Sequence, residues 1–115
     1  MKVLVVEDSE AQRLSMKMSL MMRGFDVVTA EDGEAGWLEF LQGEFDAVLT
    51  DFEMPQLDGL EFIARIKEHG SEVPIILLCA IRGLNIPSGV VHLDKNDITV
   101  TFDVIAQRLR ERIAG

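Results

Sequence analysis

Short apolar runs alternate with amphipathic segments from one end of the chain to the other. Five runs have the length and the β-branched, apolar composition of buried strands, namely Val3–Val6, Phe25–Ala30, Phe45–Thr50, Val73–Ala80 and Val90–Leu93. Strands that are apolar on both faces are typical of a parallel sheet covered by helices on both sides. We therefore predict an α/β fold in which residues 1–115 form a single domain.

The segments between these runs begin with helix-capping residues and carry apolar residues three or four positions apart. They predict helices from Ser9 to Gly24, from Asp32 to Gly43, from Asp58 to Gly70, and from a cap at Asn96 or Asp97 onward. The positions expected to face the core are Ala11, Leu14, Met18 and Met21, then Ala35, Leu38 and Leu41, then Leu60, Ile63 and Ile66, then Ile98, Phe102, Ile105, Leu109 and Ile113. Met16 and Met22 are expected beside the first of these faces, partly exposed.

The charge of the chain narrows the classes of partner. It has 20 acidic and 11 basic residues, and its formal net charge of -9 disfavours nucleic acid and anionic membranes but favours a cation or a basic protein surface. The single cysteine, Cys79, excludes an internal disulfide, and the isolated His69 and His92 do not form a zinc site by spacing. The apolar run at the N-terminus is too short for a signal peptide or a membrane span, so we expect a cytoplasmic protein.

Charged residues follow three of the predicted strands. Glu7 and Asp8 come after the first strand, Asp51 after the third and Lys95 after the fifth. The carboxyl ends of parallel strands meet at one rim of a sheet, so these side chains are expected to converge there. Clustered carboxylates need a counter-charge, which Mg²⁺ supplies, and an aspartate beside Mg²⁺ and a lysine can attack phosphorus. As the alternative, each acid taken singly is an ordinary turn or capping residue.

The run Asp51–Gly59 (DFEMPQLDG) resembles the D-x-x-M-P-x-x-D-G signature of response-regulator receiver domains, which belong to two-component signalling. The stretches VLVVEDS, AEDGEAGW and VPIILLCA resemble the same family, so the similarity covers most of the chain. This resemblance implies a flavodoxin-like, doubly wound sheet of five parallel strands in the order 2-1-3-4-5. Gly59 is expected to adopt a turn conformation that a side chain would resist.

The resemblance also implies the roles of single residues. Asp51 would be the phosphoacceptor, Asp8 and Asp51 would bind Mg²⁺ directly, and Glu7 would assist through water. The backbone carbonyl of Glu53 would complete the protein ligands, and Lys95 would pair with the phosphoryl group. The donor would be a phosphohistidine on a sensor histidine kinase or a phosphotransfer protein. Such a domain is not an enzyme in the usual sense, since it catalyses only its own phosphorylation and dephosphorylation.

Three residues depart from the family pattern. Cys79 replaces the usual Ser or Thr that carries the switch, and a thiol is only a weak hydrogen-bond donor. We expect Cys79 to pack as a buried thiol. His92 stands where an aromatic switch residue is common, and we expect its ring to pack as well. Asn96 replaces the proline that usually follows the lysine, so the cis-proline turn should be absent and Lys95 less firmly fixed.

The largest departure lies between the fourth and fifth strands, where only Ile81–Gly89 connects them. A crossover that includes a helix needs about 10–12 residues. We therefore predict that the fourth helix is missing or reduced to a single turn. Its loss is expected to uncover apolar side chains of the fourth strand together with Ile81, Leu84 and Ile86. The face formed by the fourth-helix region, the fifth strand and the last helix would then bind a partner or a second copy of the chain.

Two other functions stay open beside the phosphoacceptor. The first is a pseudo-receiver, which keeps the fold and acts as an interaction module without phosphorylation. The second is a phosphohydrolase of the haloacid-dehalogenase type, whose Asp-x-Asp motif Asp51 and Glu53 faintly resemble. The motif follows the wrong strand and no cap domain is present, which disfavours the hydrolase. A flavodoxin is disfavoured because no phosphate-binding Ser, Thr or Gly loop follows the first strand.

Overall fold

The computed structural model describes residues 1–115 and contains one sheet of five parallel strands in the order β2-β1-β3-β4-β5. The strands are β1 (Lys2–Val6), β2 (Asp26–Ala30), β3 (Ala47–Asp51), β4 (Ile75–Leu78) and β5 (Val90–Leu93). The predicted fold and strand order are confirmed. β4 is shorter than expected and begins after Pro74, whose ring nitrogen has no hydrogen to donate, although its carbonyl still accepts from the Val48 N–H.

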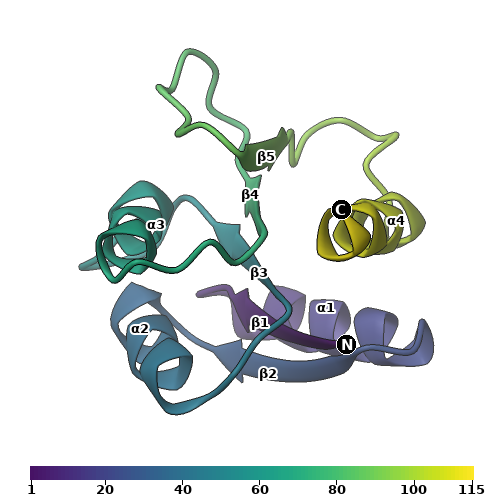
Figure 1. Ribbon diagram of the computed structural model, residues 1–115. Coiled ribbons are helices and arrows are strands. Elements are labelled where there is room, and N and C mark those ends of the chain that lie inside the picture. Colours follow the sequence, from purple (N-terminus) through teal and green to yellow (C-terminus); the bar gives the residue numbers. More distant parts are fainter.

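Four helices cover the two faces of the sheet (Figure 1). They are α1 (Glu10–Met22), α2 (Gly33–Gln42), α3 (Gly59–Glu68) and α4 (Phe102–Ala114). α2 and α3 lie against one face, and α1 and α4 lie against the other (Figure 1). The predicted caps Ser9, Asp32 and Asp58 are confirmed, because each side chain accepts a hydrogen bond from a backbone N–H three residues later.

The core forms two apolar layers, one on each side of the sheet. Successive strand residues point to opposite faces, so Val3 and Val5 face α1 and α4 while Leu4 and Val6 face α2 and α3. All four side chains are buried. Because both faces are buried, β1 is held in place from both sides, and with it the point where the chain leaves the strand.

The core face of α1 differs from the predicted one. Met16 is only 7% exposed and packs with Leu20 in the core, whereas Met18 is 56% exposed. The exposed side of α1 carries an apolar stripe of Leu14, Met18, Met21 and Met22. Since α1 is apolar on two sides, the spacing rule identified an apolar face correctly but chose the one that faces solvent.

The predicted core face of α2 is confirmed at Ala35, which packs on the core, but it is wrong at the two leucines. Gly36 meets the sheet in their place. Gly33 and Gly36 are buried, while Leu38 and Leu41 are exposed. A Cβ atom at Gly36 would lie 2.8 Å from a methyl group of Val6, which is closer than real contacts allow. The glycine spacing therefore lets the backbone of α2 approach β1 and turns the leucines outward.

The last helix begins at Phe102, several residues after the predicted cap. Asp97 accepts hydrogen bonds from the backbone and the hydroxyl of Thr99, and these local bonds form a turn that competes with a helix. Thr101 caps α4 instead, and Ile98, predicted to be in the core, is 93% exposed.

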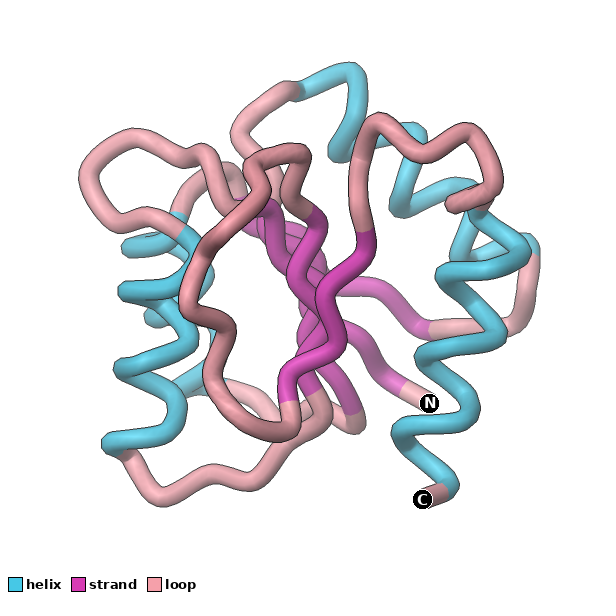
Figure 2. The backbone as a smooth tube through the Cα atoms, turned by 90° about the horizontal axis from the view of Figure 1, so that it is seen from above, coloured by secondary structure: helices cyan, strands magenta, loops and turns pink.

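The connection from β4 to β5 contains no helix, as predicted, and runs along the α3 side of the sheet (Figure 2). The expectation that its loss uncovers apolar surface is largely wrong. Leu84 and Ile86 are half-buried and pack on the core layer beneath α3, and the side chains of β4 are buried. Only Ile81, 37% exposed, remains at the surface. An extended segment thus covers the sheet where a helix would otherwise lie.

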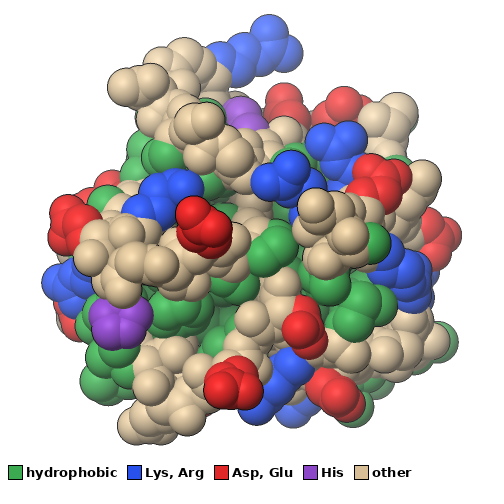
Figure 3. Space-filling view, in the orientation of Figure 1, with side chains coloured by type: hydrophobic (Ala, Val, Ile, Leu, Met, Phe, Trp, Pro, Cys, Tyr) green, Lys and Arg blue, Asp and Glu red, His purple; other side chains and the backbone are tan.

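Charged side chains of both signs are mixed over the face seen in Figure 3, without a single large patch of either sign. None of the helices has the length and apolar character that crossing a membrane requires.

The two faces of α1 predict opposite outcomes for neighbouring methionines. Met16→Ala should lower the free energy of unfolding by about 2–5 kcal/mol because it leaves a core cavity. Met18→Ala should change it by less than about 0.5 kcal/mol because the side chain is exposed. Urea denaturation of both variants measures the difference, and equal costs would contradict this orientation of α1.

Candidate functional site

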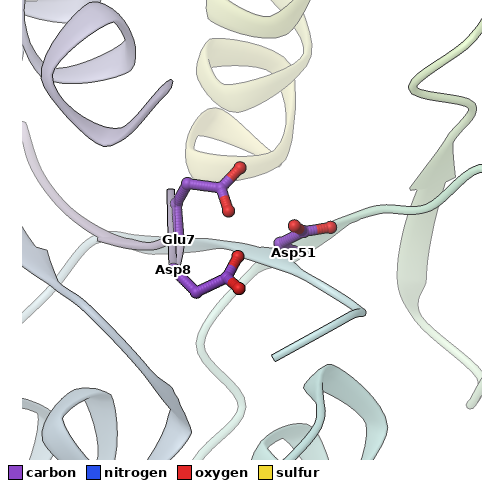
Figure 4. A group of neighbouring side chains, drawn as sticks. All are labelled: Glu7, Asp8 and Asp51. Carbon is purple, nitrogen blue, oxygen red and sulfur yellow. The ribbon is translucent and has the colours of Figure 1, made fainter. Parts of the chain in front are cut away.

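Three carboxylates meet at the carboxyl ends of β1 and β3. Glu7 and Asp8 follow β1 directly, and Asp51 is the last residue of β3. The pairing of Val6 with Thr50 in the parallel ladder brings the following residues of both strands side by side. Figure 4 shows the three side chains pointing toward one another, and one oxygen of each lies within 4.8 Å of the others. The predicted convergence of these acids is confirmed.

Glu7 has the most unfavourable environment of the three. Its side chain is 1% exposed, and its Oε1 accepts no hydrogen bond, although the ammonium of Lys95 lies 3.5 Å away. Burial, together with the neighbouring carboxyl groups of Asp8 and Asp51, raises the pKa of Glu7 to about 7, although the charge of Lys95 acts in the opposite direction. The site thus holds more negative charge than its own positive charge balances.

The donor set fits a hard divalent cation. Mg²⁺ prefers carboxylate and carbonyl oxygens and keeps coordination positions for water and phosphate. The carboxylates of Glu7, Asp8 and Asp51 offer such oxygens at one point, including the Glu7 oxygen without a hydrogen bond. Asp8 is exposed, so the cluster is open to solvent and to an incoming ion. No nitrogen or sulfur ligand belongs to this cluster, which disfavours zinc.

Lys95 reaches the cluster from the end of β5, as predicted. Its Nζ lies 2.9 Å from Asp51 Oδ2 and donates a hydrogen bond to it. Burial alone would lower the pKa of Lys95, but the hydrogen bond and the charge of Asp51 outweigh it, so this pKa is raised and the ammonium stays charged. The next residue, Asn96, donates its N–H to Asp94 Oδ1 at 2.8 Å, and no cis peptide bond is present.

The backbone after β3 fits tightly around Asp51. Phe52 donates its N–H to Asp51 Oδ1 at 2.8 Å, and Gly59 donates its own to the Phe52 carbonyl at 2.9 Å. A Cβ atom at Gly59 would lie 2.4 Å from the Asp51 carbonyl oxygen. Gly59 is therefore required for close approach, and the expectation of a special turn conformation there is wrong. Gln56 is the loop residue with a positive φ, at 69°.

Two residues of the first turn of α1 also belong to the site, and the sequence analysis missed them in this role. Arg13 donates from Nη1 to the backbone carbonyl of Glu7 at 2.9 Å and so holds the short segment between β1 and α1. Gln12 accepts from Lys95 Nζ at 3.4 Å. The only signal in the sequence was their position one turn after the acidic pair.

The departures from the family pattern lie beside the cluster. Cys79 is buried as predicted, and its Sγ accepts from the Ile81 N–H at 3.2 Å. His92 does not pack as expected; its ring is exposed, and its Nε2 lies 3.0 Å from the Cys79 carbonyl oxygen. The side chain of Glu53 is exposed and outside the carboxylate cluster, and the role of its carbonyl stays a prediction.

Comparison with known sequences gives consistent matches. The family model of the response regulator receiver domain matches residues 3–108. The chain is 38% identical over 79 residues to the response regulator MprA of Mycolicibacterium vanbaalenii, covering 69% of this chain and 34% of that protein. It is 39% identical over 80 residues to the transcriptional regulatory protein DltR of Streptococcus agalactiae, covering 70% and 36%. The chain thus spans about a third of the length of these curated relatives.

Solved structures show the same fold over nearly the whole chain. A response regulator receiver domain protein from Clostridium thermocellum superposes with a TM-score of 0.88 at 26% identity, covering 98% of this chain and 94% of that one. The response regulator TrrA from Thermotoga maritima, solved in complex with Mg²⁺ and BeF, gives 0.80 at 29% identity, covering 96% and 97%. With the match of the family model and the shared fold, this chain belongs to the response-regulator receiver domains of two-component signalling.

Proposed function

We propose that this receiver domain accepts a phosphoryl group on Asp51 in a Mg²⁺-dependent reaction. We further propose that phosphorylation switches its contact with a partner protein or an output domain. The observation that carries the proposal is the ion pair of Lys95 with Asp51, 2.9 Å long and placed beside the acidic pair Glu7 and Asp8. An ordinary turn aspartate would not need a cation from one strand end and two acids from another.

The transfer would make Asp51 the nucleophile. One oxygen of its carboxylate forms a bond to phosphorus while the bond from phosphorus to the donor's imidazole nitrogen breaks. The electron pair of that broken bond stays on the imidazole, whose other ring nitrogen carries a proton, so that the donor leaves as neutral histidine. The ammonium group of Lys95 contacts Asp51 in the unphosphorylated protein. After the transfer it would contact a phosphoryl oxygen. A lysine is suited to this exchange because its three N–H donors can change partners without moving the stem.

Glu7, Asp8 and Asp51, with the backbone carbonyl of Glu53, would hold the magnesium ion. When bound, the ion supplies positive charge that neutralises and orients the oxygens of the transferring group. The unpaired oxygen of Glu7 supports this proposal, as does the Mg²⁺–BeF complex of the relative TrrA. Arg13 would keep Glu7 in place for this role, because its guanidinium donates to the Glu7 backbone carbonyl.

The partner would be a sensor histidine kinase or a phosphotransfer protein. α1 begins beside the carboxylates, and its exposed apolar stripe of Leu14, Met18, Met21 and Met22 would contact this partner. For a homodimer or partner at the face of β5 and α4, support is weaker, since the connecting segment covers most of the apolar surface expected there.

A phosphorylation-independent pseudo-receiver is the second candidate. The observation that favours it is Cys79, because its sulfur already accepts from Ile81 and offers no hydroxyl to a phosphoryl group. The hydrolase interpretation finds no support, since the Glu53 side chain lies outside the cluster that contains Asp51. The next experiment separates the phosphoacceptor from the pseudo-receiver.

Incubation with acetyl phosphate and Mg²⁺ should add one phosphoryl group to the wild-type protein, measured by intact mass spectrometry. Asp51→Asn should abolish this gain because the amide is a poor nucleophile, and EDTA should abolish it in the wild type. Asp26→Asn is the matched control, since Asp26 lies exposed at the opposite end of the sheet. A wild-type protein that gains no mass would support the pseudo-receiver.

The raised pKa of Glu7 predicts a pH-dependent stability of the metal-free protein. Its carboxyl keeps a proton in the folded state up to about pH 7, whereas the unfolded chain releases it near the ordinary value of 4.5. The free energy of unfolding should therefore fall as the pH rises from 4.5 to 7, by roughly 1–3 kcal/mol from this group, and fall no further above that.

Urea denaturation in EDTA across this range tests the effect, with Glu7→Gln as the variant that lacks the titrating group. The difference in unfolding free energy between wild type and variant should change between pH 4.5 and 7 and then stay constant. A difference that is constant over the whole range would contradict the assigned environment of Glu7.

A further inference from the structure

Two helices begin with the same kind of capping sequence but use it differently. At α3, Asp58 accepts from the Glu61 N–H at 2.9 Å and Glu61 Oε1 accepts from the Asp58 N–H at 3.2 Å, so both halves of a capping box are present. At α1, Ser9 accepts from the Gln12 N–H at 3.3 Å. The return bond from the Gln12 side chain is missing there.

The missing half is explained by the acidic pair. In a complete capping box, the Ser9 N–H would donate to the Gln12 side chain. Here it donates to Glu7 Oε2 at 3.3 Å. The buried carboxylate of Glu7 thus replaces Gln12 in the cap. The amide of Gln12 is released from the cap, and its oxygen accepts from Lys95 Nζ instead.

Lys95 depends on such contacts for its position. It lies just after the edge strand β5, in a segment without regular structure, and its side chain is 28% exposed. The ammonium donates hydrogen bonds to Asp51 Oδ2 at 2.9 Å and to Gln12 Oε1 at 3.4 Å. Its third neighbour is Glu7 Oε1, which lies 3.5 Å away as an ion-pair partner without a hydrogen bond.

Among these three residues, Gln12 is the neutral one, and its side chain neither reacts with phosphorus nor binds the cation. Under the proposed function, Asp51 becomes bonded to phosphorus and Glu7 turns to the cation. Of the present contacts of Lys95, only the one with Gln12 would then remain. The phosphoryl oxygen would be its new partner. We propose that Gln12 is a positioning residue for phosphoryl transfer, which holds the Lys95 ammonium where the phosphoryl group arrives.

The test compares Gln12→Met with wild type in the acetyl phosphate reaction, and this inference rests on the proposed function. Methionine keeps the length and helix propensity of glutamine but removes the acceptor oxygen. We expect the rate of phosphorylation at saturating Mg²⁺ to fall about 3- to 10-fold, the range of an ordinary hydrogen bond, because this contact is long and exposed. The Kd for Mg²⁺ should change less than about twofold, since Gln12 contacts no carboxylate.

Two further measurements separate positioning from a merely structural effect. Gln107→Met, at an exposed position of α4, is the matched control and should keep the wild-type rate. In a Lys95→Ala background, Gln12→Met should cause no further loss, because its effect passes through the lysine. The NMR signals of the Lys95 ε-methylene group in the unphosphorylated protein should shift in Gln12→Met and not in Gln107→Met.

The outcomes are distinguishable. A phosphorylated wild type with an unchanged rate in Gln12→Met would overturn the inference alone. The inference would also be overturned if Gln12→Met lowered the rate equally in the wild type and in Lys95→Ala. NMR signals of Lys95 that do not shift in Gln12→Met would overturn it as well. A wild-type protein that takes up no phosphoryl group would overturn the proposed function, and with it the role given to Gln12.

Discussion

The crowding of three carboxylates at one rim of the sheet is the constraint on which the site depends. Glu7 and Asp51 are buried and directly follow Val6 and Thr50, which pair on the neighbouring strands β1 and β3. The fold therefore holds like charges together that would separate in water. Their repulsion is tolerated because β1 and β3 are fixed from both faces by apolar layers. Packing energy therefore maintains an electrostatic imbalance that a cation can relieve.

The neighbouring polar contacts follow from this imbalance. Lys95, Arg13 and Gln12 all turn toward the acidic rim, from the end of β5 and from the first turn of α1. The carboxylate of Glu7 accepts from the Ser9 N–H, which in a capping box would donate to Gln12. The two cationic side chains donate to groups of the rim, Gln12 accepts from Lys95, and the resulting network fixes the groups around Asp51 before any ligand arrives.

Much of this arrangement was predictable from the sequence. The strands, three helix caps, the missing helix and the convergence of Glu7, Asp8, Asp51 and Lys95 depend on local patterns or on the rule that parallel strands end together. The errors arose where tertiary packing chose between local alternatives. Met16 and Met18 are both apolar, and only the position of Phe25 and Leu20 in the core decides which one is buried. His92 was expected to pack, but the end of β4 offers it a carbonyl at the surface.

The extended connection between β4 and β5 has a consequence for how the molecule opens. Residues 79–89 lack the internal hydrogen bonds of a helix, and side chains anchor their far end, through Lys67 to the Ser88 carbonyl and Arg112 to that of Gly89. β5 has a neighbouring strand on one side only and four ladder residues. Detaching this edge therefore breaks fewer bonds than opening any central strand, so we expect it to open more readily than the centre of the sheet. Because Lys95 follows β5 after a single residue, opening of this edge would also move the lysine of the site.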